Sequence, residues 1–251
     1  GCIGAEPALA HVRGKFVGGL RLPGDETGDA HVFTQRLAAM AAARGVTFRH
    51  GVTIAALETE GDRVTGVTSS EGRVTADAYV VAMGSYSPAL LRPLNVHVPV
   101  YPVKGYSLTL PVTEEAGAPV STVMDETYKV AITRLGARVR VGGTAELSGM
   151  NTTLREARRL TLTRSVEDLF PFAGAARKAR FWAGLRPSTP DGVPYVGPTR
   201  REGLWLNVGH GTLGWTMAAG SASVLAQALD GSLTGALAGL AEPDAIFVGG
   251  G

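Results

Sequence analysis

The clearest pattern of apolar and polar positions lies towards the C-terminal end of the chain. A short apolar run at 204–208 is followed by a glycine-rich turn at 209–214 and by small apolar residues at 217–229. The run predicts a buried strand, and the later segment predicts a helix. A strand, a glycine turn and a helix in this order present backbone N–H groups and a positive helix end to an anionic ligand. Two interpretations stay open: a helix N-terminus that faces a cofactor, or a tight turn without a ligand.

The same turn spells G-x-G-x-x-G through Gly209, Gly211 and Gly214. That spacing occurs in dinucleotide-binding loops, where a second strand follows the helix and ends in an acidic residue about 20 positions on. Asp230 has nearly this spacing, but it follows the predicted helix directly, with no strand before it. The turn is therefore not expected to be the pyrophosphate loop of a Rossmann unit.

Elsewhere the periodicity alternates between that of helices and that of strands. Apolar residues recur at helical spacing over 30–44, with Asp29 as a predicted N-cap, and again over 153–170. An alternating run over 98–110 predicts a strand with one buried face. Further short strands are predicted at 15–22, 46–48, 52–58, 64–69, 73–76, 77–85, 120–124, 128–133, 138–142 and 179–185.

Composition limits the class of protein. The 251 residues are 45% hydrophobic and 18% charged, which is typical of a globular chain. The net charge is +2, without a long basic run, so nucleic-acid binding is not indicated. The single cysteine, Cys2, excludes a disulfide framework, and the five histidines lack metal-ligand spacing, so no metal site is expected.

Five motifs, in order along residues 5–235, resemble one known family. The chain is similar to the small subunit of D-amino acid dehydrogenases, FAD-dependent oxidoreductases of the D-amino acid oxidase superfamily. The motifs are GGLRLPGDETGD at 18–29, YPVKGYSL at 101–108, DETYK at 125–129, GLRPSTPDG at 184–192 and GHGTLGWT at 209–216. The βαβ unit with which this family begins has no counterpart in the sequence, so the resemblance implies the C-terminal part of such an enzyme.

The resemblance implies a mixed α+β and α/β fold of two intertwined domains. Residues 25–96 and 180–240 would form an incomplete FAD-binding domain of the two-dinucleotide-binding type. Residues 1–24 and 97–179 would form a substrate-binding domain built on an antiparallel sheet.

The resemblance also assigns cofactor and substrate residues. Backbone N–H groups of the turn would meet the flavin. Arg186 would bind the substrate carboxylate through two parallel hydrogen bonds, or it would pair with a local acid such as Asp191. Tyr106 and Tyr128 would either line the substrate site or be core tyrosines on strands, which is the commoner case. Lys104 could lie near the flavin, but a solvated lysine is expected. His210 would either line the flavin or pack the turn. The expected cofactor-binding residues are Val52, Ala82, Gly84, Ser85, Gly209, His210, Gly211, Thr212, Leu213 and Gly214.

The implied activity is oxidative deamination of D-alanine-like D-amino acids to 2-oxo acids and ammonia. A hydride would pass from the substrate Cα to flavin N5, without an obligatory catalytic base, and electrons would go to a quinone or another acceptor. An O₂-using oxidase of amines, glycine or sarcosine is one alternative. A non-catalytic fragment that needs the missing N-terminal part is another. The expected location is the cytoplasm, with peripheral contact at the inner membrane.

Overall fold

The computed structural model describes residues 1–233 and divides the chain into two compact units. Unit 1 consists of Gly1–Gly45 and Lys104–Leu185. Unit 2 consists of Val46–Val103 and the chain from Arg186 onward. Each unit is therefore assembled from two separate segments of sequence, as the intertwined pattern predicts.

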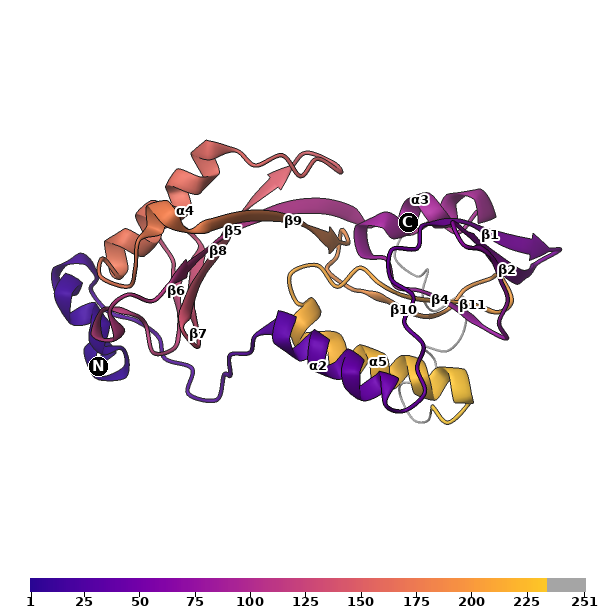
Figure 1. The fold of residues 1–251 in the computed structure, drawn as a ribbon, viewed down its shortest axis with the longest axis horizontal. Coiled ribbons are helices and arrows are strands. Elements are labelled where there is room, and N and C mark those ends of the chain that lie inside the picture. The colour runs from indigo at the N-terminus through magenta and orange to yellow at the C-terminus, as the bar shows by residue number, and fades with distance from the viewer. Residues whose placement is uncertain (234–251) are drawn as a thin grey trace. The chain divides into compact units, whose positions relative to one another are not determined.

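Unit 1 is built on a five-stranded sheet in the order β6-β7-β8-β5-β9 (Figure 1). Strands β6 to β8 are antiparallel neighbours in sequence. Helix α4 (Glu156–Leu169) covers one face of the sheet. The strands are β5 (Tyr101–Pro111), β6 (Thr122–Asp125), β7 (Val130–Leu135), β8 (Arg138–Leu147) and β9 (Arg180–Ser188).

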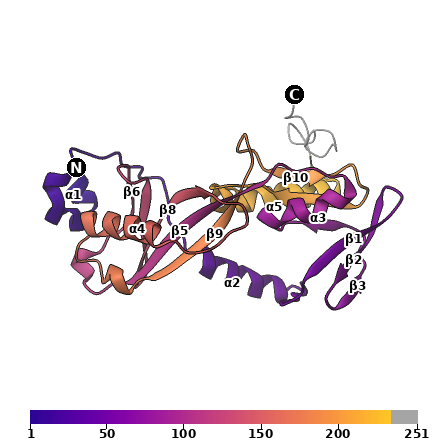
Figure 2. The ribbon, with the colours of Figure 1, turned by 90° about the horizontal axis from the view of Figure 1, so that it is seen from above.

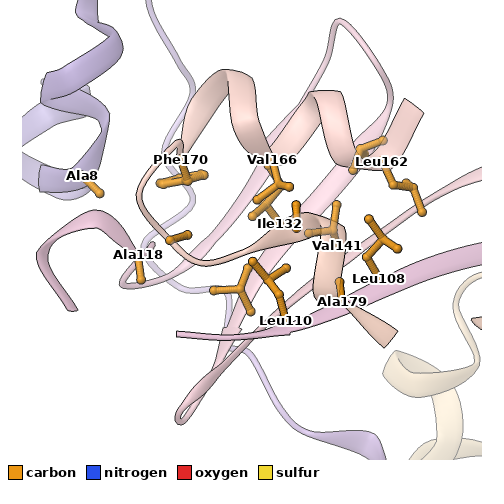
Figure 3. Packing of buried hydrophobic residues seen from close by; sticks show 14 of the residues in the cluster. Ala8, Leu108, Leu110, Ala118, Ile132, Val141, Leu162, Val166, Phe170 and Ala179 are labelled. Atoms are coloured by element: carbon orange, nitrogen blue, oxygen red, sulfur yellow. The ribbon is translucent and has the colours of Figure 1, made fainter. Parts of the chain in front are cut away.

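The hydrophobic core of unit 1 lies between this sheet and α4. Leu108, Ile132 and Val141 point from three strands towards Leu162 and Val166 of the helix, and all of them are buried (Figure 3). The alternation of buried and exposed residues along β7 and β8 matches the period of a sheet with one covered face.

Three N-terminal helices complete unit 1. They are α1 (Cys2–Ala5), the 3-10 helix η1 (Pro7–Lys15) and α2 (Ala30–Ala42). Asp29 caps α2 as predicted, since its carboxylate accepts hydrogen bonds from the N–H groups of His31 and Val32. The strand predicted at 15–22 is wrong, because the segment after Lys15 contains Gly18 and Gly19, which weaken a strand, and forms no sheet pairing.

Unit 2 contains two three-stranded sheets. Strands β1 (Ile54–Glu60), β2 (Arg63–Ser69) and β3 (Gly72–Val74) form an antiparallel meander, drawn side by side in Figure 2. Strand β11 (Leu204–Val208) lies between antiparallel β10 (Tyr195–Pro198) and parallel β4 (Tyr79–Val81). Helix α5 (Gly214–Asp230) packs on β10 and β11. Helix α3 (Ser87–Leu91) follows β4 and packs on β1.

The strand predictions in unit 2 are mostly confirmed, with three exceptions. Residues 46–48 form no strand, and β10 was not predicted, since its four residues end in Gly197 and Pro198 and carry no alternation. The buried strand expected over 77–85 is shortened to three residues. Among the helices within residues 1–233, none is long and apolar enough to cross a membrane.

The borders of the compact units differ from those of the predicted domains. Residues 25–45 group with unit 1, because Asp29 forms an ion pair with Arg138 at 2.7 Å and Thr27 hydrogen-bonds Thr122 at 2.7 Å. The first part of β9 also belongs to unit 1, through the five-stranded sheet. Residues 234–240 of the predicted FAD-binding domain lie outside the described residues. Which unit binds cofactor and which binds substrate stays a prediction.

Candidate functional site

The turn between β11 and α5 has the backbone geometry of a ligand-facing loop. Gly209 and Gly211 have φ angles of +88° and +53°, which favour glycine. Helix α5 starts at Gly214, earlier than predicted, and no side chain caps its N-terminus. The first-turn N–H groups of a 17-residue helix and the positive end of its dipole are thus presented at the turn.

The end of β4 lies at the same sheet edge as this turn. Leu204 and Leu206 of β11 pair in parallel with Tyr79 and Val81 of β4, so the carboxyl ends of both strands meet at one edge. Ala82, Gly84 and Ser85 follow β4 directly. Ligands of open α/β sheets bind at such edges.

The end of β9 is joined to the turn by the backbone. The Gly211 N–H donates to the carbonyl oxygen of Pro187 at 2.9 Å, and Ser188 forms an antiparallel bridge with His210. A Cβ atom added to Gly84 would lie 3.6 Å from Cγ of Pro187. The structure therefore brings together the predicted segments 84–85, 186–188 and 209–214 within unit 2.

Arg186 directly precedes Pro187 and is half-buried. Burial lowers the pKa of its guanidinium, but an arginine side chain stays charged in proteins. A half-buried guanidinium beside the glycine turn at 209–214 is suited to bind a carboxylate. A guanidinium is more weakly hydrated than an ammonium group, so its burial costs less.

His210 sits in the turn itself. Its Nε2 lies 3.0 Å from Oγ of Ser221 on α5, and burial lowers the pKa of the ring below 6.5. The imidazole is therefore neutral at pH 7. This contact accounts for a packing role in the turn, and a flavin contact stays a prediction.

The remaining predicted residues lie elsewhere. Val52 lies in the loop just before β1, the first strand of the β1 to β3 sheet. Tyr106 and Tyr128 belong to unit 1. The Tyr106 ring is 2% exposed and stacks on Phe181, and its hydroxyl donates to Glu146 at 2.8 Å. The Tyr128 hydroxyl donates to Asp168 at 3.1 Å, which raises the pKa of the phenol. Their substrate roles stay predictions.

Lys104 corrects an expectation. It is fully buried rather than solvated, and its Nζ lies 3.1 Å from Oε1 of Glu146. Glu146 also lies 3.1 Å from Arg155 and 3.7 Å from Arg158. No spacing in the sequence indicates this cluster, since Lys104 and Glu146 are 42 positions apart.

The family of the chain follows from its similarity to known proteins. The model of the FAD dependent oxidoreductase family, DAO, matches residues 3–228. The chain belongs to this family. A D-amino acid dehydrogenase of Methylobacterium nodulans is 71% identical over 92% of the chain, and one of Xanthobacter autotrophicus is 66% identical. Both matches cover 55% of the relative, so the chain spans about half the length of these curated relatives.

Solved structures of the DAO fold agree with the architecture. Glycine oxidase of Geobacillus kaustophilus superposes with a TM-score of 0.83 over 96% of this chain and 64% of its own, at 23% identity. Glycine oxidase of Bacillus cereus is 27% identical, with a TM-score of 0.70 over 81% of this chain and 57% of its own. The predicted fold class and the expected FAD cofactor are confirmed at the level of the DAO family.

The DAO chain also carries polar groups that fit a bound FAD. Within residues 1–233, the buried Oγ1 of Thr189 and Oδ1 of Asn207 have no hydrogen-bond partner. Asn207 lies on β11 and Thr189 beside Gly209, so both are next to the turn. Sequence patterns did not indicate either residue. Three or more potential metal ligands do not cluster anywhere in the described part of the chain.

Proposed function

We propose that the chain is the flavin-ring part of a D-amino acid dehydrogenase, which oxidatively deaminates D-alanine-like substrates to 2-oxo acids and ammonia. The observation that carries this proposal is the Gly211–Pro187 hydrogen bond of 2.9 Å, which couples the cofactor turn to the segment of Arg186. The 71% identity to a D-amino acid dehydrogenase supports the choice of substrate.

In this proposal unit 2 holds the cofactor. The N–H groups of Gly211, Thr212, Leu213 and Gly214 would face the pyrimidine edge of the flavin, where the helix dipole stabilises negative charge. The backbone would approach the cofactor closely at five further positions: Val52, Ala82, Gly84, Ser85 and Gly209. Bound FAD supplies a two-electron acceptor for the hydride of the substrate Cα.

Arg186 would bind and orient the substrate carboxylate with two parallel hydrogen bonds. With the amine neutral, loss of the Cα hydride and of one amine proton leaves an imino acid, which water hydrolyses to the 2-oxo acid and ammonia. The protein mainly orients and desolvates the substrate, so no catalytic base is assigned. Tyr106 and Tyr128 would belong to the substrate-binding unit. The proposed electron acceptor is a quinone or another carrier, reached through peripheral membrane contact.

An anaerobic visible spectrum tests the proposal. FAD is mixed with the purified chain, and D-alanine is then added. Perturbed flavin absorbance followed by bleaching supports the proposed activity. Perturbed absorbance without bleaching by any D-amino acid contradicts it.

An O₂-using oxidase of glycine or sarcosine is a second candidate, favoured by the 27% identity to a glycine oxidase. Oxygen consumption during turnover, with glycine as substrate, would identify it. A third candidate is a chain that binds no FAD by itself, since the chain spans about half of its relatives. Flavin binding that appears only with a chain covering the remaining half of the relatives would support that candidate.

A further inference from the structure

Helix α2 presents a row of large apolar side chains. Phe33, Leu37 and Met40 follow one another at intervals of four and three residues, so they lie on one face of the helix over about 10 Å. They are 49%, 51% and 54% exposed, respectively. None of the 13 residues of α2 is buried, and neither hydrophobic core within residues 1–233 includes any of them. Phe33, Leu37 and Met40 thus form an α2 stripe that is about half exposed.

A helix as short as α2 depends on the packing of its apolar face. Isolated helices below about 12–15 residues are marginally stable in water, and most helical stability in proteins comes from tertiary contacts of an amphipathic face. Asp29 caps α2 through one carboxylate oxygen and pairs with Arg138 of β8 through the other, at 2.7 Å. These contacts fix the first turn of α2 to unit 1, but they bury none of the α2 stripe.

The relatives contain further chain that can cover the α2 stripe. The family match over residues 3–228 includes α2, so the helix belongs to the part that this chain shares with the family. The match to the relative of Methylobacterium nodulans covers 55% of that protein, which leaves nearly half of its length outside. A contiguous apolar face that is exposed on a globular protein marks an interaction surface.

A second copy of the chain fits the α2 stripe less well. Three side chains that are half exposed offer on the order of 300 Å² of surface. A stable complex of two molecules buries about 800 Å² on each of them. A segment of the same polypeptide needs less area, because its docking costs no translational freedom. The size of the stripe therefore favours a cover from the same polypeptide.

We propose that the α2 stripe is the docking surface for the part of the D-amino acid dehydrogenase polypeptide that lies outside the match. That part would cover Phe33, Leu37 and Met40 with an apolar groove or sheet face. Apolar anchors at helix positions i, i+4 and i+7 are the usual contacts of a helix in such a groove. The docking needs neither FAD nor a substrate, so it goes beyond the proposed activity and does not depend on it.

The test compares this chain alone with a full-length protein in which it replaces the matched part of the Methylobacterium nodulans relative. Leu37→Glu should lower the Tm of the full-length protein by at least about 4 °C, because docking would bury a carboxylate without a partner. In the chain alone the same change should shift Tm by less than about 1 °C, since Leu37 is exposed there. Gln35→Glu adds the same group about 160° away around the helix. It is the matched control and should have little effect on either protein.

Hydrogen exchange gives a second measurement that needs no variant. The backbone N–H groups of Ala30–Ala42 should exchange at least about tenfold more slowly in the full-length protein than in the chain alone, because docking stabilises the helix. Equal exchange rates, or equal Tm shifts for Leu37→Glu in the two proteins, would overturn the docking role. A chain that is dimeric by itself and becomes monomeric with Leu37→Glu would overturn it too. Neither measurement uses a substrate, so a failure of the proposed activity would leave both outcomes unchanged.

Discussion

The backbone N–H of Gly211 donates to the carbonyl oxygen of Pro187 at 2.9 Å, so the residue after Arg186 is fixed to the turn that begins α5. Ser188 and His210 add an antiparallel bridge, one residue after Pro187 and one residue before Gly211. These contacts hold the strand end and the helix N-terminus in one arrangement. Arg186, the proposed substrate-binding cation, and the N–H groups proposed to meet the cofactor are thereby held near one another by backbone contacts alone.

Substitution of Gly209 tests how closely the turn at 209–214 packs against Thr189. Gly209→Ala places a Cβ atom 2.8 Å from Cγ2 of Thr189 at a φ of +88°, so both a clash and backbone strain are added. We expect the free energy of unfolding to fall by about 2–3 kcal/mol and FAD binding to weaken. Urea denaturation and flavin titration measure the two effects.

Gly192→Ala is the matched control for this change. Gly192 also has a positive φ, +79°, but a Cβ atom there meets no atom within 4 Å. Backbone strain alone should cost about 1 kcal/mol and leave the FAD affinity intact. Equal losses in the two variants would show that contact with Thr189 does not matter.

Arg186 can be tested for carboxylate binding in the holoenzyme. Arg186→Leu removes a charge-assisted pair, and we expect KM for D-alanine to rise about 10- to 100-fold, since hydrogen bonds to charged groups contribute about 1.5–3 kcal/mol. Arg180→Leu removes an exposed arginine from the start of the same strand and should leave KM unchanged. An unchanged KM in Arg186→Leu would exclude the carboxylate role.

Local sequence patterns correctly predicted the strands, helices and caps whose structure depends only on residues close together in the sequence. The run at 204–208 became β11 over the same residues, and Asp29 caps α2 as its position before an apolar period indicates. The long-range clusters could not be predicted in this way. Lys104 and Glu146 meet only because β5 and β8 are neighbours in the sheet, and Thr189 approaches Gly209 only because β9 ends beside β11. Such juxtapositions depend on topology rather than on periodicity.

The buried pair of Lys104 and Glu146 yields a stability prediction. The pKa of Lys104 is raised, first by hydrogen bonding with Tyr106 and then by Glu146, so the ammonium stays charged in the core. Glu146→Leu leaves this ammonium without its carboxylate, and we expect Tm to fall by at least about 5 °C.

A double variant separates the pair from simple packing. Lys104→Met combined with Glu146→Leu should lose less Tm than the two single changes added together, because neither buried charge is then left alone. Lys129→Met, which breaks the exposed pair with Glu126, should hardly change Tm. Additive losses in the double variant would contradict coupling between Lys104 and Glu146.

His210 makes the stability of unit 2 depend on pH. Burial lowers the pKa of its imidazole below the ordinary 6.5, so the unfolded chain takes up a proton before the folded chain does. The contribution of the neutral ring is complete above pH 6.5 and is lost as the pH falls towards the folded-state pKa. We expect the urea midpoint of the wild type to decrease between pH 7.5 and pH 5.5 more than that of His210→Asn, which keeps a polar group opposite Ser221. The same decrease in both proteins would mean that other groups cause the pH dependence and that His210 is accessible to water in the turn.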